Sequence, residues 1–406
     1  MESNKQQKKL IGSTAYTVAG GLLMNGVLQA LIYPSLNRQM GSSQLGSLLF
    51  IMGLLGIVCP SIGQALNTSR LVVRRTMDVT NGDYNSMLLF FGALGSLAAL
   101  IIGRGSLNGI GDAAAVVILL LLMVFRYYGD VEYRLNLHYE KYFAYYAVLT
   151  AGYLLGMLLF KLTGVWYFIF LTGEALALAY LAATGSVFKR FFERSSFFKT
   201  AARRGAFLLG SYVITNLTLN IDRLALKFLV GDLAVTEYYV SSLLGKTLIL
   251  LVAPVNTIII SFLTKRKELL NRKQYMQFTG AGFLVALVFF AGTQVGTPIF
   301  LKIFYGNLYD SVKPVISIVN ASQILGLLSA YLFILVLTFT EEKWQMVLQA
   351  LHLGTIIVLV LFLTDGSLEG FSRAVLLANA VRVALVVLFG LIMNGRGEMK
   401  PSTRRD

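Results

Sequence analysis

Apolar residues run along this chain in long, nearly unbroken stretches. A stretch of about 20 such residues lets an α-helix cross the roughly 30 Å hydrocarbon core of a bilayer. The stretches are continuous and do not alternate with a period of two, so the pattern favours helices over a β-barrel. It predicts twelve transmembrane helices, at 11–33, 45–66, 87–103, 112–129, 142–160, 164–185, 205–227, 235–262, 278–300, 314–338, 344–363 and 371–393.

The composition excludes the main alternatives to a membrane protein. Of the 406 residues, 56% are apolar and 14% are charged, whereas a soluble domain carries about 25% charged residues. With a mean hydropathy of +0.70, a single soluble core could not bury so much apolar surface. Six Pro and one Cys exclude a collagen-like or disulfide-stapled chain. The predicted fold class is an all-α polytopic membrane protein.

The basic residues predict the orientation of the chain. With the amino terminus inside, 25 of the 35 Lys and Arg residues fall in predicted inner segments and 7 in outer ones. This count places Arg70 in the inner segment 67–86 and Arg126 in the inner segment 126–141. The positive-inside rule then predicts a membrane protein with both termini in the cytoplasm. The net charge of +15 is explained by this topology and by bilayer lipid as a partner, so nucleic-acid binding is not expected.

The longest basic inner loop, 186–204, divides the chain into two similar halves. Six spans precede it and six follow it, which predicts an amino-terminal lobe at 1–200 and a carboxy-terminal lobe at 201–406. Six spans per lobe starting on the same side make the lobes parallel repeats. Substrate sites in such transporters lie between the repeats near the membrane midplane, so a central cavity is expected.

Several ionisable residues fall within the predicted spans. Glu174, Lys246 and Arg382 lie near the middle of their spans, and Asp222 and Arg223 lie near the outer end of theirs. Each such group costs about 2.5–3.5 kcal/mol at mid-bilayer, so each calls for a functional reason. Buried Arg and Lys favour an anionic ligand such as a phosphate group, which predicts a cationic cavity.

Polar residues recur at helical spacing beside these charges. Asn216, Asn220 and Arg223 form one stripe, Asn379 precedes Arg382 by three residues, and Asn25 lies on the first span. Such stripes either line a wet cavity that binds substrate or form interhelical hydrogen bonds that stabilise the bundle. For Glu174 three interpretations are open: an ion pair with a buried base, a proton or cation site, or a neutral buried acid.

No signature of catalysis or of a cofactor is present. The sequence has no phosphate-binding loop of the nucleotide-binding type, and its two histidines, His138 and His352, cannot assemble a metal cluster. No outer loop is long enough to house a catalytic domain. The sequence therefore predicts neither an enzyme nor a metal or organic cofactor, and it leaves H⁺ or Na⁺ as a possible coupling ion.

The stretch from Asn220 to Gly231, with its Asp222-Arg223 pair, and the following Tyr238-Tyr239 resemble a motif of the bacterial polysaccharide flippases. These O-antigen repeat-unit translocases belong to the multidrug/oligosaccharidyl-lipid/polysaccharide exporter superfamily. The resemblance implies that the chain moves an undecaprenyl-pyrophosphate-linked glycan across the membrane by alternating access, beside other glycan-assembly membrane proteins. Asp222 and Arg223 match the motif, whereas Lys246 and Arg382 are candidates from their burial alone. Glu174 and Asp222 are the candidates for ion coupling.

Two rival functions remain open. A multidrug or cation exporter of the same superfamily would require acidic groups in its cavity to bind a cation. This chain has more bases than acids within its predicted spans. A membrane-embedded glycan polymerase or ligase would carry a large outer loop, and none is found. The repeat-unit flippase is therefore the main hypothesis and the exporter its first alternative.

Overall fold

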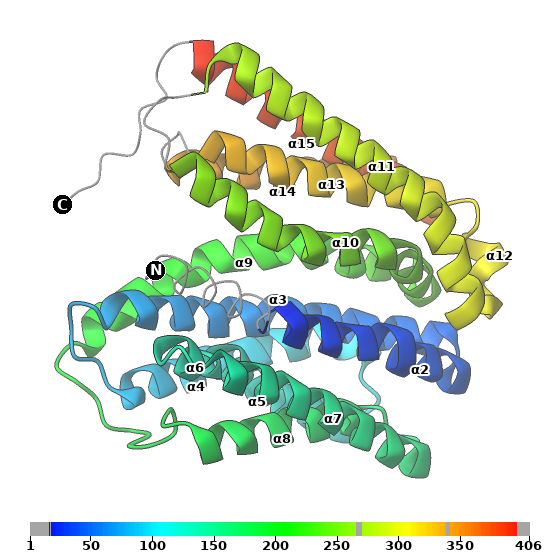
Figure 1. Ribbon diagram of the computed structural model, residues 1–406. Helices are drawn as coiled ribbons and strands as arrows, with labels where there is room; N and C mark the ends of the chain where they lie inside the picture. The colour runs from blue at the N-terminus through cyan, green and yellow to red at the C-terminus, as the bar shows by residue number, and fades with distance from the viewer. Residues whose placement is uncertain (1–15, 17, 265–269, 338–341, 396–406) are drawn as a thin grey trace. The chain divides into compact units, whose positions relative to one another are not determined.

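The computed structural model describes residues 16, 18–264, 270–337 and 342–395 (Figure 1). Every regular element in these residues is a helix. The chain divides into two compact units, Met1–Leu224 and Ala225–Asp406. The division falls inside helix α9 (Phe198–Leu229), later in the chain than the predicted boundary between residues 200 and 201.

The amino-terminal unit begins with a helix at Val18–Met40. This helix contains a π-helical turn, Leu28–Ile32, followed directly by α2 (Tyr33–Met40) with Pro34 in its first turn. The unit continues with α3 (Ser42–Val73), α4 (Asn81–Gly103), α5 (Ile110–Gly129), α6 (Val131–Leu135), α7 (Tyr139–Thr163) and α8 (Tyr167–Thr184), a 3-10 turn at Arg104–Ser106, and most of α9.

The carboxy-terminal unit is helical as well. It contains α10 (Asp232–Thr264), α11 (Arg272–Phe304), α12 (Tyr309–Val312), α13 (Ile316–Leu337), α14 (Glu342–Leu363) and α15 (Leu368–Gly395), with a 3-10 turn at Gly306–Leu308. Together the two units hold twelve long helices among the described residues. They coincide one for one with the twelve predicted spans, so the predicted fold class is confirmed.

Nine helices in the described part of the chain are long and apolar enough to cross a membrane, and Val347–Leu363 is a shorter apolar helix. The chain is a multi-pass membrane protein. The nine are Val18–Met40, Ser42–Val73, Asn81–Ser106, Ile110–Leu135, Tyr139–Thr163, Tyr167–Thr184, Arg272–Phe304, Ile316–Val336 and Leu368–Ile392.

Several helices run past the ends predicted for them. The spans 45–66 and 112–129 extend to Val73 and, through α6, to Leu135. Arg70 therefore lies within a helix, as Arg126 does, and both are buried. Both were counted as inner-segment charges from the sequence, and their long apolar stems and polar partners let them lie inside the bundle.

Glycines bring α7 and α8 together in the amino-terminal unit. Gly152 and Gly156 are spaced by four on α7, and a Cβ added to either would lie only 2.6 Å from backbone atoms of Gly173 or Ile169 on α8. Small residues at this spacing let membrane helices approach closely and strengthen van der Waals packing between them. Such packing matters because the hydrophobic effect does not favour helix association in lipid. This contact fixes α8, which carries Glu174, against α7.

Helix α13 packs against α10, α11 and α15 in the carboxy-terminal unit, and α14 packs against α15. The core there includes Tyr275 of α11, Leu328 and Leu332 of α13, and Val386 of α15. The Tyr275 hydroxyl reaches the backbone carbonyls of Val386 and Val387 at 3.4 Å. The core is therefore apolar, and the hydroxyl of Tyr275 is satisfied by backbone carbonyls of α15.

Candidate functional site

A buried ion pair joins α5 to α8 in the amino-terminal unit. The Arg126 guanidinium donates through Nε to both carboxylate oxygens of Glu174, at 2.9 Å to Oε1 and 2.6 Å to Oε2. Arg126 is 3% exposed and Glu174 is fully buried. Because the pair carries no net charge, burying it inside the helix bundle costs less free energy than burying either residue alone.

Aromatic side chains enclose this pair. The Tyr153 hydroxyl of α7 donates to Glu174 Oε1 at 2.9 Å. The Arg126 guanidinium lies 4.1 Å from the centre of the Tyr127 ring, and the Tyr145 hydroxyl donates to the Arg126 backbone carbonyl at 3.3 Å. The carboxylate thus has three hydrogen bonds from two residues, which is the satisfaction that a buried charge requires.

The local sequence explains why these three helices meet here. Gly173 precedes Glu174, and a Cβ added to Gly173 would collide with the Tyr153 ring. The missing side chain therefore lets Tyr153 approach the carboxylate. Of the three interpretations open for Glu174, the structure shows the ion pair. Arg126 was not recognised as the partner from the sequence, although its place within the apolar run Met123–Tyr128 was a signal that the helix continues through it.

The polar stripe on α9 faces α3. Asn216 Nδ2 donates to Ser61 Oγ at 3.1 Å. Asn220 Nδ2 donates to the backbone carbonyl of Gly56 at 3.3 Å, and the Arg223 methylenes lie beside Gly53. These contacts match the interhelical interpretation of the stripe, with small α3 residues opposite each polar side chain. A role for the three residues in substrate binding stays a prediction.

Two further predicted residues make local contacts. Asp222 Oδ1 accepts a hydrogen bond from the backbone N–H of Arg223 at 2.9 Å. Asn25 Nδ2 donates to the carbonyl of Gly21, one turn earlier on the same helix, at 2.9 Å. Neither contact assigns an ion or substrate to these side chains, so both roles stay predictions.

The predicted residues of the carboxy-terminal unit lie on α10 and α15. The Lys246 ammonium lies 6.0 Å from the centre of the Tyr238 ring. Asn379 Nδ2 donates to Ser322 of α13, at 2.9 Å to Oγ and 3.1 Å to the backbone carbonyl. Arg382, one turn further along α15, forms no ion pair with any acid among the described residues, and its charge interacts with the buried His352 of α14.

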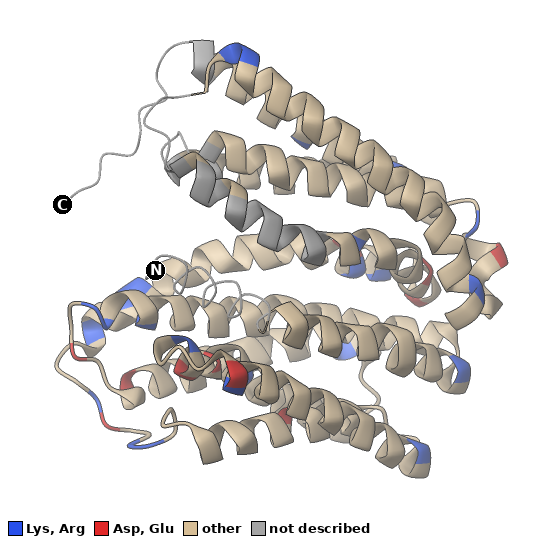
Figure 2. Cartoon of the chain, viewed as in Figure 1, with Lys and Arg blue, Asp and Glu red and all other residues tan. Residues whose placement is uncertain are grey.

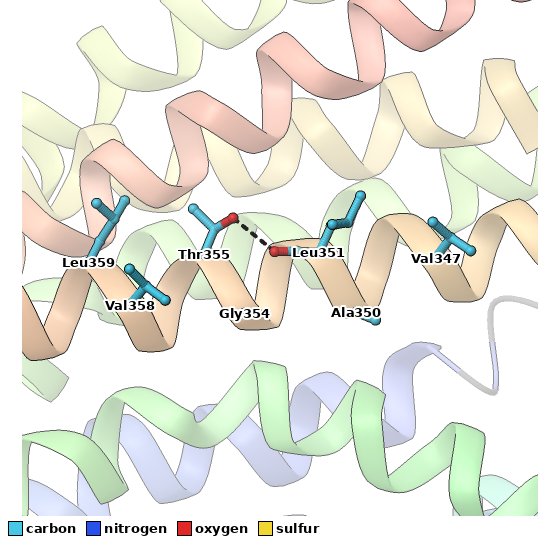
Figure 3. Close-up of a pocket in the computed structure, with 7 residues that line it drawn as sticks. All are labelled: Val347, Ala350, Leu351, Gly354, Thr355, Val358 and Leu359. Atoms are coloured by element: carbon cyan, nitrogen blue, oxygen red, sulfur yellow. Dashed lines mark hydrogen bonds between the residues drawn. The ribbon is translucent and has the colours of Figure 1, made fainter.

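The described cavities are apolar. A pocket of about 650 Å³ runs along one face of α14. Figure 3 shows its lining residues, Val347, Ala350, Leu351, Gly354, Thr355, Val358 and Leu359. A second pocket, of about 220 Å³, lies between α11 and α13. None of the predicted charged residues lines either pocket, so the expected cationic cavity between the lobes stays a prediction. The described residues also contain no group of three or more metal-ligating side chains.

Comparison with known proteins identifies the fold. No protein-family model matches the sequence, and a search of curated proteins finds no match. Among solved structures, the chain is similar to an inward-facing multidrug resistance MATE family transporter of the MOP superfamily, with a TM-score of 0.69, 14% identity, and 95% of each chain covered. It is also similar to a MATE structure in the bent conformation, with a TM-score of 0.57, 14% identity, and 96% of each chain covered.

A third structure agrees with these two. The Vibrio cholerae MATE transporter VcmN in its bent form has a TM-score of 0.56 and 14% identity, covering 96% of this chain and 97% of that one. The chain therefore has the fold of the MATE transporters of the MOP superfamily, a superfamily that also contains polysaccharide and lipid flippases. These neighbours are transporters and not enzymes.

Proposed function

We propose that this protein is a membrane transporter that moves its substrate by alternating access of its two helical units. The observation that carries the proposal is the fold shared with MATE transporters over 95% of both chains. The predicted two lobes of six spans each are the repeated architecture that rocking transporters use. An H⁺ or Na⁺ gradient is the proposed energy source, because the sequence has no nucleotide-binding loop.

Export of small organic compounds is the first candidate activity. Its support is that a solved structure of the same fold is described as a multidrug resistance transporter. The proposed coupling residue is Glu174. Protonation would neutralise its carboxylate and leave the buried Arg126 guanidinium without a counter-charge, which is an expensive state that favours a conformational change. Asp222 is the second candidate for coupling.

Translocation of a lipid-linked anionic glycan is the second candidate activity. Its support is the charge balance of the described spans: Glu174 is already neutralised by Arg126, whereas Arg382 has no acidic partner among the described residues. A guanidinium in that position suits a pyrophosphate head group. Arg382, Lys246 and Arg223, with Asn216, Asn220, Asn379 and Asn25, are the proposed substrate-contacting residues, the cytoplasmic membrane is the proposed location, and glycan-assembly membrane proteins are the proposed neighbours.

Two assays on one strain distinguish the candidates. The gene is deleted and then restored as wild type or Glu174→Gln, with Glu193→Gln as a control at an exposed acid. An exporter restores efflux of a fluorescent cationic dye, and the Glu174 variant loses the dependence of efflux on the ion gradient while the control keeps it. A flippase instead prevents lipid-linked repeat units from accumulating on the cytoplasmic face. If restoring the gene changes neither readout, the proposal of transport is wrong.

A further inference from the structure

The segment that joins α8 to α9, residues 185–197, is unusually basic and aromatic, and we refer to it as the connector. From 186 to 204 the chain holds six basic residues, one acidic residue and five Phe. Figure 1 shows the connector as the green loop between α8 and α9, and Figure 2 shows Lys and Arg along it and at the start of α9. The candidate transport roles use none of these residues.

Helix α4 holds the connector in one conformation. The fully buried Asp83 carboxylate accepts hydrogen bonds from the Ser195 backbone N–H at 2.8 Å and from the Ser195 hydroxyl at 2.6 Å. Asn81 Nδ2 donates to the backbone carbonyls of Ser186 at 2.7 Å and Lys189 at 2.9 Å. Asn85 Nδ2 donates to the carbonyl of Val187 at 3.1 Å. The connector is therefore fixed to its own unit by side-chain hydrogen bonds at both ends.

This attachment separates the connector's side chains into two sets. Val187 is buried, and the rings of Phe188 and Phe191 lie 6.0 and 5.9 Å from the ring of Phe125 on α5. The outward set is exposed and contains Lys189, Arg190, Phe192 and Arg194. Phe192 is 72% exposed, so a large apolar ring lies on the same surface as these cations.

Further exposed cations adjoin this set. Arg74 and Arg75 lie in the turn before α4, and Thr80 in the same turn donates through its hydroxyl to the backbone carbonyl of Glu193 at 2.5 Å. The connector and this turn thus form one surface, which we call the basic face: Arg74, Arg75, Lys189, Arg190, Phe192 and Arg194. Two acids, Asp78 and Glu193, lie among the five cations, so the face keeps a net positive charge.

We propose that the basic face is a binding surface for the head groups of anionic phospholipids in the adjoining membrane leaflet. The positive charge is complementary to phosphatidylglycerol-type head groups, and exposed Phe inserts favourably at the boundary between head groups and acyl chains. The hydrogen bonds from Asp83, Asn81 and Asn85 hold the cations in place before lipid arrives, which lowers the entropy cost of binding. The inference does not depend on which substrate the protein transports.

Lipid selection by the full-length protein tests this proposal. The protein is reconstituted into nanodiscs of phosphatidylcholine with increasing phosphatidylglycerol, and retained lipid is measured by mass spectrometry with the thermal unfolding midpoint. Wild type enriches phosphatidylglycerol and unfolds at a higher temperature as its fraction rises. Each surface cation contributes a few-fold to the preference, so Lys189→Gln with Arg190→Gln and Arg194→Gln reduces it by roughly tenfold or more. Raising the salt concentration toward about 1 M weakens the wild-type preference, because screening shortens to roughly 3 Å.

The matched control removes three exposed cations elsewhere, Lys161→Gln with Lys302→Gln and Lys313→Gln. It changes the net charge equally and keeps the lipid preference. Phe192→Ser, which removes no charge, lowers the preference less than the triple variant does. Circular dichroism and size exclusion confirm that each variant is folded. The proposal is overturned if the control and the connector variants lose the preference equally, or if wild type shows none.

Discussion

The two units treat buried charge differently. In the amino-terminal unit, Arg126 is neutralised by Glu174, and the buried Arg70 donates to Tyr128 Oη at 2.6 Å and to Asn81 Oδ1 at 2.5 Å. In the described part of the carboxy-terminal unit, hydrogen bonds between neutral groups join the helices, and the Lys246 ammonium lies beside the Tyr238 ring. Asn379 pairs there with Ser322, and Asn320 with Thr297, whereas Arg382 has no acidic partner.

This difference separates structure from candidate function. A charge that the unit neutralises itself is a structural element, because breaking the pair leaves an uncompensated charge in the bundle. A charge without an acidic partner is retained where neutral groups satisfy its hydrogen bonds, as Tyr128 and Asn81 do for Arg70, or where a ligand or ion pairs with it. Arg382 is therefore the candidate substrate contact that this comparison favours, whereas a coupling role for Glu174 requires that protonation break its pair with Arg126.

The largest effect is expected from breaking the buried pair. Arg126→Met leaves the Glu174 carboxylate buried without its cation and should lower the free energy of unfolding by about 3–5 kcal/mol. The double variant with Glu174→Gln should recover most of this loss, because neither buried charge remains. Unfolding in detergent micelles, followed by circular dichroism, measures both. The exposed Arg373–Glu369 pair is the control, and a loss on Arg126→Met no larger than that on Arg373→Met would contradict the comparison.

A smaller effect is expected from separating α7 and α8. A side chain at Gly156 meets backbone atoms of α8, so Gly156→Val should destabilise the protein by about 1–3 kcal/mol through overpacking. A Cβ added to Gly280 of α11 would meet open space. Gly280→Val is therefore the matched control in the other unit. Thermal unfolding of both variants measures the difference, and equal midpoints would show that the close contact does not exist.

A still smaller effect is expected from the neutral polar contact between α13 and α15. Asn379→Ala removes the hydrogen bonds to Ser322 and should cost about 0.6 kcal/mol, with roughly 1.7 kcal/mol as the upper end for such membrane contacts. Ser322→Ala gives a double-mutant cycle that isolates the pair. If Asn379→Ala lowers transport strongly while stability changes little, the residue contacts substrate and the structural interpretation is wrong.

The smallest change in stability is expected at Arg382. Arg382→Gln removes a charge that has no acidic partner among the described residues, so the free energy of unfolding should stay unchanged or rise. If the substrate is anionic, the same variant loses a charge-assisted contact of about 1.5–3 kcal/mol, and transport falls roughly 10- to 100-fold. Lys313→Gln, at an exposed lysine, is the control. A marked loss of stability in Arg382→Gln would mean that this arginine is a structural residue.

The helices were predictable because their cause is local. Each apolar run needs only its own length and composition to cross a bilayer, and the run 45–66 predicted α3 without reference to any other segment. The ends were less predictable. Helix α3 continues to Val73, where Arg70 finds Tyr128 and Asn81 as partners, and Tyr128 comes from a helix distant in the sequence.

The candidate site was predicted only in part. Glu174 was recognised as an acid that requires a reason, but its partner Arg126 was assigned to a loop because it lies near the end of an apolar run. Asn216 and Asn220 were recognised as one stripe, but only the packing of α9 on α3 shows that they meet Ser61 and Gly56. A helical stripe indicates which residues share a face, and it does not indicate what that face contacts.

The sequence by itself determined a membrane protein of twelve helices. In a bilayer, only helices and closed β-barrels satisfy the hydrogen bonds of the backbone, and long apolar runs form helices. The tertiary structure decided which polar residues pair and which do not. Hydrogen bonds and ion pairs act over a few ångströms, so their partners are set only when helices distant in sequence are brought together. That packing pairs Glu174 with Arg126, and among the described residues it brings no acid to Arg382.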